Sequence, residues 1–336
     1  MRSTGRIIAL TGLLVLLAAA AVAAILTSGK ASARPAGGTI SLVAYSTPRD
    51  AYSQLIPAFQ DTSAGRGTSF QQSYGGSGEQ ARAVIAGLKA DVVAFSLEPD
   101  MTSLVKAGLV AKTWKQEPFH GLVTHSVVVF AVRKGNPKNI RGWADLIKPG
   151  VDVVTPNVQT SGGAKWNVMA AYGAQRRIGL SHARSVKYLE KLYDHVVSQD
   201  KSAREALQTF LAGRGDVLLA YENEAIFAQK HDQPLDYVIP KATILISNPI
   251  AVVKTSKNKT TARAFVNFLR GKPAQVIFGQ NGYRPVLRKA ARQFGFPRPP
   301  RVFSIEWLGG WAKVDKRFFD PNTGIVTRIQ KKKGGG

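Results

Sequence analysis

The chain has 336 residues, of which 44% are hydrophobic and 20% charged, a composition typical of a globular protein large enough to bury a substantial core. It contains no cysteine, which excludes disulfides, thiolate metal sites and cysteine nucleophiles. The formal net charge is +25, but the basic residues are scattered and no helix-turn-helix, zinc-finger or RNA-binding aromatic signature accompanies them, so we expect no nucleic-acid partner.

The N-terminus has the pattern of an export signal. Arg2 and Arg6 precede an apolar run from Ile7 to Leu26, and Ala31-Ser32-Ala33 then fits a small-x-small cleavage site. The run is also long enough to span a bilayer as a helix, which takes about 20 residues. Residues 1–38 are therefore expected to be a cleaved signal peptide, or an N-terminal membrane anchor, with a tether. Both interpretations place the remainder outside the cytoplasmic membrane.

From Thr39 onwards the chain alternates strands, turns and helices. Strands are expected at 40–45, 69–74, 91–95, 126–132, 151–154, 217–221 and 243–253, the last interrupted by Pro249. Helices are expected after the turns near Ser46, Ser77, Ser161 and Ser202, and over 182–195 and 261–269. Such alternation predicts an α/β fold of mostly parallel sheets with helices on both faces.

The stretch at 155–167, TPNVQTSGGAKWN, combines a buried strand end, a turn of small residues and a helix start. The first N–H groups of that helix have no acceptor within it, and Gly162 and Gly163 let a ligand approach the main chain closely. With the Ser161 hydroxyl they would form a neutral cup of donors that suits a small anion. Alternatively, the S-G-G sequence only makes a tight bend and caps the helix.

Four turns of this kind, near Ser46, Ser77, Ser161 and Ser202, follow strands, and ligands of parallel sheets bind beyond the carboxyl ends of the strands. Ser202 and Glu205 have capping-box spacing, as do Ser77 and Gln80. Ser77 could therefore have the purely structural role of capping its helix, as an alternative to ligand binding. No metal-ligand spacing of histidines, no G-x-S-x-G elbow and no P-loop ending are present. We therefore expect no enzyme, no metal site and no cofactor.

Six pieces of sequence occur in order over nearly the whole chain after the export signal. They are YGGSGEQA at 74–81, VRKGNPK at 132–138, DLIKPGV at 145–151, TSGGAKWN at 160–167, GDVLLAYENEA at 215–225 and GGWAKV at 309–314. This set resembles the periplasmic sulfate- and thiosulfate-binding proteins of ABC importers, from about Ile40 to Phe319. The resemblance implies a two-lobed periplasmic-binding-protein-like fold, with two hinge crossovers and an anion buried between the lobes. The implied parts are a first lobe from 39–122 and 247–327, a second lobe from 123–246, and a basic disordered tail at 328–336.

The resemblance also implies a set of ligand-binding residues. Ser77 would supply a donor from the first lobe, and the second lobe would supply Ser161, Gly162, Gly163 and the backbone N–H of Ala203. Two further members depart from the family pattern: Tyr221 replaces a frequent tryptophan, and Ser46 replaces a common aspartate. A cation in the first turn of a helix is disfavoured by the helix dipole, so Lys165 suggests an anion nearby.

The expected function is capture of sulfate or thiosulfate by a monomeric extracytoplasmic receptor that delivers the ion to an ABC permease. Sulfate carries no proton at neutral pH, so a pocket of donors alone satisfies it, whereas hydrogen phosphate needs an acceptor. No Asp or Glu lies within 155–167 or 73–78, and the acids expected nearest to the site are Glu79, Glu222 and Glu224. The alternative is a wall- or polyanion-attached surface protein without small-anion binding, which the +25 charge and the two replacements favour.

Overall fold

The computed structural model of the protein describes residues 38–334, which belong to one compact unit, Gly37–Gly336. The predicted signal peptide or anchor at 1–38 lies outside the described residues, apart from its last residue. Within 38–334, no helix combines the length and the apolar character that crossing a bilayer requires.

The first lobe is built around a parallel sheet in which β1 lies between β2 and β3. Its side chains alternate as a buried strand requires: Leu42 and Ala44 pack in one core cluster, and Val43 packs in another on the opposite face. The strands are β1 (Thr39–Tyr45), β2 (Ser69–Gly75) and β3 (Val92–Ala94). Helices α2 (Arg49–Gln60), α9 (Lys259–Arg270) and α10 (Lys272–Gln280) cover one face, and α3 (Ser77–Ile85) and α4 (Glu98–Lys106) cover the other.

The second lobe repeats this arrangement, with β5 between β6 and β7 in parallel pairing. Leu219 and Tyr221 pack towards one core cluster, and Leu218 and Ala220 pack towards the other. The strands are β5 (Val153–Pro156), β6 (Val196–Asp200) and β7 (Val217–Tyr221). Helices α5 (Gly162–Arg177) and α6 (His182–Asp194) cover one face, and α7 (Ala203–Leu211) and α8 (Glu222–Lys230) cover the other.

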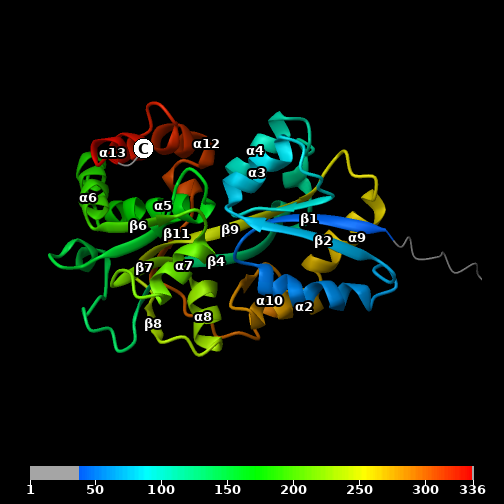
Figure 1. Cartoon of the computed structure of the whole chain (residues 1–336), viewed down its shortest axis with the longest axis horizontal. Helices are drawn as coiled ribbons and strands as arrows, with labels where there is room; N and C mark the ends of the chain where they lie inside the picture. The colour runs from blue at the N-terminus through cyan, green and yellow to red at the C-terminus, as the bar shows by residue number, and fades with distance from the viewer. Residues whose placement is uncertain (1–37, 335–336) are drawn as a thin grey trace, which may run out of the picture. The chain divides into compact units, whose positions relative to one another are not determined.

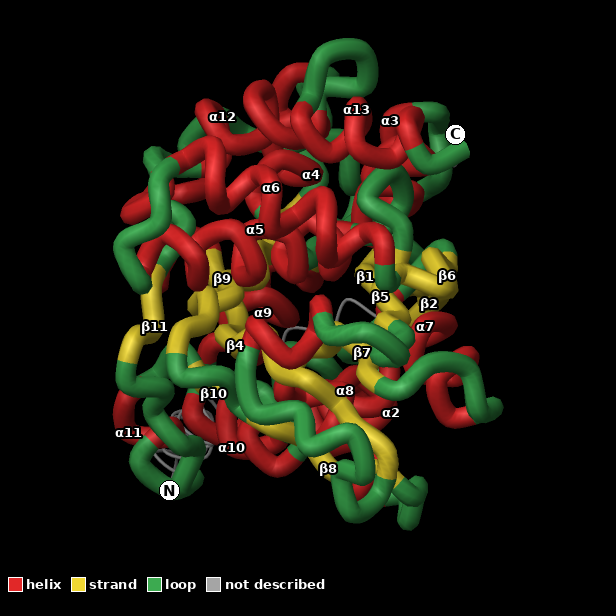
Figure 2. Tube along the Cα trace, turned by 90° about the vertical axis from the view of Figure 1, so that its left-hand side faces the viewer, coloured by secondary structure: helices red, strands yellow, loops and turns green. Residues whose placement is uncertain are grey.

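Two long antiparallel strands, β4 (Leu122–Arg133) and β9 (Ala242–Val252), connect the lobes (Figure 1). In the second lobe β4 pairs with β7 and β8 (Leu235–Val238), and in the first lobe β9 pairs with β3. Figure 2 shows the strands as a middle layer between helices. The predicted α/β, two-lobed fold with two crossovers is confirmed. The predicted interruption at Pro249 is wrong, because β9 continues through Pro249. The Pro249 carbonyl accepts the Phe95 N–H at 3.0 Å.

The C-terminal segment corrects the predicted lobe assignment. Its elements are β10 (Arg284–Pro285), α11 (Arg288–Ala291), β11 (Arg301–Phe303), α12 (Trp311–Val314) and α13 (Ile325–Lys332). Buried side chains from Phe303 to Ile329 join the core cluster of α5 and α6, so 303–327 packs mainly with the second lobe, while α12 also contacts α4 of the first lobe. The predicted disorder from 328 is wrong up to Lys332, because Ile325, Val326 and Ile329 give α13 an apolar face that is buried. The other predicted lobe boundaries stay predictions.

Candidate functional site

All seven residues that the sequence analysis selected line one small cavity. They are Ser46, Ser77, Ser161, Gly162, Gly163, Ala203 and Tyr221, and the rest of the lining is Tyr45, Thr47, Gly75, Gly76 and Ser96. The volume that the centre of a water-sized sphere can reach is about 10 Å³, close to the minimum that holds one small bound species. None of the lining residues has a charged side chain. The cavity therefore suits a compact polar ion.

The topology brings these residues together, because each lies where a strand ends or a helix begins. β1, β2 and β7 end at Tyr45, Gly75 and Tyr221, on the cavity. Helices α3, α5 and α7 begin at Ser77, Gly162 and Ala203, which also line it. Carboxyl ends of parallel strands share one edge of a sheet, and the helices that follow them start at that edge. Two such edges, one from each lobe, enclose the cavity.

Backbone donors dominate the cavity. The N–H groups of Ser77, Gly162, Gly163 and Ala203 are not donated to any acceptor within residues 38–334. The Ser161 hydroxyl caps no N–H of α5 and lies in a side chain that is 96% buried. Free N–H groups at helix starts, together with the helix dipoles, attract negative charge. The arrangement can therefore surround an anion with uncharged donors.

Two buried tyrosines line the cavity. The Tyr45 hydroxyl is buried and forms no hydrogen bond of ordinary length among the described residues, and it lies near the hydroxyls of Thr47, Thr124 and Tyr283, of which only Thr47 lines the cavity. The Tyr221 hydroxyl lies 2.6 Å from Ser96 Oγ, so this pair joins the second lobe to the first. Burial raises the pKa of both tyrosines, which keeps their hydroxyl protons in place at neutral pH. The sequence analysis missed Tyr45, and the only available signal was its position directly before Ser46.

Ser77 contributes differently from the prediction of a helix cap. Its hydroxyl donates to Asp100 Oδ2 at 2.5 Å and accepts the N–H of Ser96 at 2.9 Å, while Gly76 takes the N-cap position of α3. Its single proton is thus committed, and the free donor of Ser77 is its backbone N–H. Asp100, 92% buried, was absent from the acids expected near the site. Burial raises the pKa of Asp100, and the positive charge of Lys165 and the Ser77 hydrogen bond oppose this shift.

The charged groups around the cavity are paired with one another. Arg204 follows Ala203 and donates to Asp50 Oδ2 at 2.8 Å and to both oxygens of Glu224 at 2.9 Å. Because Asp50 belongs to α2 and Glu224 to α8, this network crosses between the lobes. Lys165 forms an ion pair with Asp315 at 2.7 Å and does not line the cavity, so an anionic ligand near it stays a prediction.

The lobes are in direct contact around the cavity. The N–H of Gly78 donates to the Thr160 carbonyl at 3.0 Å, and Trp166 Nε1 donates to the Ser96 carbonyl at 2.9 Å. Gly162 approaches the first lobe so closely that a Cβ there would lie 2.0 Å from Leu97 Cδ2. A glycine is therefore required at this point by packing against the other lobe.

The start of α7 differs from the predicted capping box. Ser202 caps α7, because its Oγ accepts the Glu205 N–H at 3.2 Å. The reciprocal bond of a capping box is not formed, because the Glu205 carboxylate accepts from the Ser202 hydroxyl at 3.0 Å and not from its backbone N–H. Within residues 38–334, no group of three or more His, Asp or Glu side chains is placed to hold a metal ion.

A small, donor-lined cavity between two α/β lobes that are joined by two strands defines a solute-binding protein. A family model described as bacterial extracellular solute-binding protein matches residues 40–284, and the chain belongs to this family. It is accordingly a binding protein and not an enzyme, in agreement with the names of its relatives.

The relatives confirm the resemblance to sulfate- and thiosulfate-binding proteins. A sulfate-binding protein from Synechococcus elongatus is 42% identical over 319 residues, which cover 90% of this chain and 91% of that protein. One from Escherichia coli is 38% identical over 305 residues, covering 86% of this chain and 92% of that protein. A thiosulfate-binding protein from Pseudomonas aeruginosa is 35% identical over 296 residues, covering 82% and 88%.

Solved structures agree with these relatives. The sulfate-binding protein SubI from Mycobacterium tuberculosis superimposes with a TM-score of 0.82 at 44% identity, covering 84% of this chain and all of that one. A periplasmic thiamin binding protein shares the fold, with a TM-score of 0.65 at 16% identity, covering 87% of this chain and 95% of that one. Together these similarities favour a solute-binding protein over a polyanion-attached surface protein.

Proposed function

We propose that this protein captures a sulfate or thiosulfate ion between its two lobes and delivers it to an ABC-type permease. The observation that carries the proposal is the cavity whose lining has no charged side chain and whose backbone N–H groups at Ser77, Gly162, Gly163 and Ala203 have no acceptor within 38–334. The names of the sulfate- and thiosulfate-binding relatives supply the chemical identity of the ion.

The donors of the cavity favour an anion that carries no proton. Hydrogen phosphate would need an acceptor for its proton, and an unsatisfied buried group costs roughly 1–3 kcal/mol. The acids next to the cavity are already engaged, because Asp100 accepts the Ser77 proton and Glu224 is paired with Arg204. Sulfate and thiosulfate, which are fully deprotonated at neutral pH, would leave no such proton unmatched.

The number of donors is sufficient for tight binding. A micromolar dissociation constant corresponds to about 8 kcal/mol. About five hydrogen bonds to an anion, at roughly 1.5–3 kcal/mol each, can supply this against the cost of removing the ion from water. The hydroxyl of Ser161 would add to the four backbone N–H groups. Contact between the lobes would exclude water and strengthen each of these bonds.

The rest of the proposal concerns where the protein works. Family membership places it outside the cytoplasmic membrane, and residues 1–38 would act as a signal peptide or as an anchor that keeps the protein beside its permease. The lobes would open and close about β4 and β9, and the protein would act as a monomer.

The proposal is tested by calorimetric titration of the chain from Gly38 onwards with sulfate, thiosulfate, molybdate and phosphate. We expect binding of sulfate or thiosulfate with a dissociation constant near the micromolar range and at least tenfold weaker binding of phosphate, about 1.4 kcal/mol. A preference for phosphate would refute the selectivity argument. No heat with any of the four ions would refute the function.

A further inference from the structure

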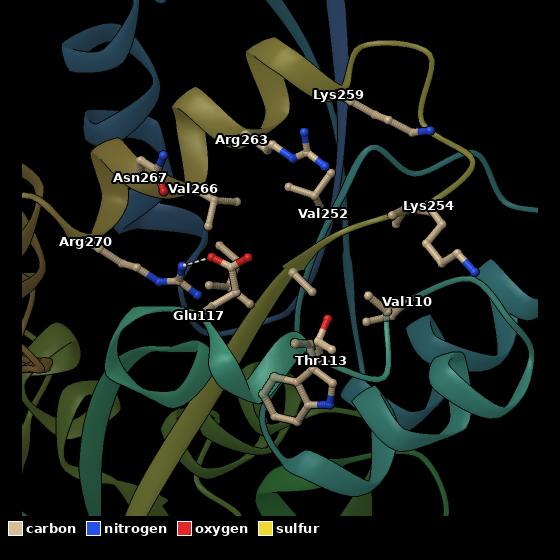
Figure 3. A pocket seen from close by; sticks show the side chains of 15 residues that line it. Val110, Thr113, Glu117, Val252, Lys254, Lys259, Arg263, Val266, Asn267 and Arg270 are labelled. Atoms are coloured by element: carbon tan, nitrogen blue, oxygen red, sulfur yellow. Dashed lines mark hydrogen bonds and ion pairs between the residues drawn. The ribbon is translucent and has the colours of Figure 1, made fainter.

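A second cavity lies in the first lobe, and it shares no residue with the donor-lined cavity. It is bounded by α9, by the end of β9 and by the segment 110–117, and its volume is about 230 Å³ (Figure 3). That volume is below the roughly 300–1,000 Å³ of pockets for drug-sized ligands, so it suits a smaller molecule. The proposed capture of sulfate does not use it.

The wall of this second cavity is largely apolar. Val110, Val252, Val266 and Trp114 form much of it, and Val110, Val266 and Trp114 are buried. An apolar part of a ligand that lies against this wall is removed from water. This favours binding by about 25 cal/mol for each Å² of apolar surface buried.

Positive charge lines one side of the cavity. Lys259, Arg263 and Arg270 recur along α9 at spacings that place them on one helix face, and Lys254 follows β9. Glu117 is the only acidic residue among the residues that line the cavity. The charge of this lining therefore favours an anion over a cation or a neutral molecule.

Arg270 is the feature that indicates a specific site. Its side chain is 4% exposed, and its Nη2 is buried without a hydrogen-bond partner. Nε donates to the Leu122 carbonyl, and Nη1 donates to Glu117 Oε2, both at 3.3 Å. Figure 3 shows the guanidinium at the end of α9 turned towards Glu117. A buried guanidinium with a free N–H edge costs stability unless another acceptor completes its hydrogen bonds.

Glu117 is a weak partner for this cation. Its side chain is 58% exposed and its contact with Arg270 is long for a charged hydrogen bond. An incoming carboxylate could therefore replace it while Glu117 turns to solvent. The planar guanidinium matches two carboxylate oxygens, and Arg263 and Lys259 would attract the same anion from the exposed side.

We infer that this second cavity binds a small organic carboxylate with an apolar body, independently of the sulfate cavity. The carboxylate takes the place of Glu117 at Arg270 Nη1, and the hydrocarbon lies against Val252, Val266 and Trp114.

The test is a calorimetric titration of the same chain with octanoate, with acetate and with neutral octyl glucoside as matched probes. We expect octanoate to bind at least tenfold more tightly than acetate and than octyl glucoside, and saturating sulfate should leave its affinity unchanged. No binding of octanoate, equal binding of the neutral probe, or competition by sulfate would overturn the inference.

Three variants assign the binding to this cavity. Glu117→Gln should tighten octanoate binding about threefold, because it removes the competing carboxylate. Arg263→Glu should weaken it about tenfold, whereas Arg184→Glu on α6 should not change it. Arg270→Met should abolish it. If Arg270→Met does not fold, the other two variants still test the site, because Glu117→Gln should tighten octanoate binding and Arg263→Glu should weaken it.

Sulfate titration of the same variants separates this inference from the proposed function. Each variant should bind sulfate as the wild-type protein does. Unchanged octanoate affinity in both Glu117→Gln and Arg263→Glu would refute the carboxylate site, whatever the sulfate titration gives.

Discussion

Replacing Gly162 by alanine should weaken sulfate binding while leaving the protein folded. The new methyl group would lie 2.0 Å from Leu97 Cδ2 and 2.7 Å from Ser96 Oγ, whereas ordinary contacts begin near 3.4 Å. Leu97 is fully buried, so its side chain cannot turn out to solvent without moving its neighbours. Overpacking of this kind costs about 1–3 kcal/mol, which corresponds to roughly a 5- to 150-fold loss of affinity.

The substitution should weaken sulfate binding and not lower the stability of the fold. The new methyl group, at the start of α5 in the second lobe, clashes with residues that follow β3 in the first lobe. Separation of the lobes about β4 and β9 removes the clash, so only the closed, ion-bound form is penalised. Calorimetry with sulfate measures the loss of affinity, and thermal unfolding without sulfate measures stability. Small-angle scattering should show that sulfate compacts the wild-type protein more than the variant.

Gly163→Ala is the matched control, since it makes the same change one residue along the same helix. A Cβ at Gly163 would lie 3.3 Å from Ser161 Oγ and 3.4 Å from Ala203 Cβ, contacts that are tight but lie within the second lobe. We expect a smaller loss of affinity for this variant. Wild-type affinity in Gly162→Ala, or a marked loss of its stability with unchanged affinity, would refute the reasoning.

Three further predictions concern the same site. Ser161→Asp should abolish sulfate binding in calorimetry with an unchanged unfolding midpoint, because it places a carboxylate in the cavity; retained affinity would mean that Ser161 does not face the ion. Sulfate affinity should rise as the pH falls through the pKa of Asp100, which burial raises, because protonation removes a negative charge beside the anion. Asp100→Asn should abolish this dependence, and a flat wild-type profile across the acidic range would contradict it. Arg204→Met should lower the free energy of unfolding by about 3–5 kcal/mol in a denaturant titration, because the Glu224 side chain, which is 1% exposed, loses its partner. A loss below about 1 kcal/mol would show that Glu224 finds another partner or reaches solvent.

Local patterns in the sequence predicted the elements that carry the cavity. The apolar strands before Ser46, before the 155–167 stretch and before Glu222 are β1, β5 and β7. The turns after β1 and β5 hold small residues, so their positions and their donor character are readable from residue type alone, whereas β7 runs directly into α8 at Glu222. The six sequence pieces added the two-lobed arrangement and the chemical class of the ligand.

Partners distant in the sequence could not be read in this way. The commitment of the Ser77 proton to Asp100, the missing partner of Tyr45 and the bridge from Arg204 to Asp50 all depend on contacts between separate elements. The same holds for the burial of α13, whose basic residues had suggested disorder.

The sequence by itself therefore determined which backbone groups are left without partners at the starts of helices, because helix geometry leaves them free wherever a helix begins. Only the tertiary structure decided which side chains near those groups keep a proton to donate, and which glycine is required by the opposite lobe. A hydrogen bond or a steric contact exists only once two surfaces meet, and no local pattern encodes that meeting.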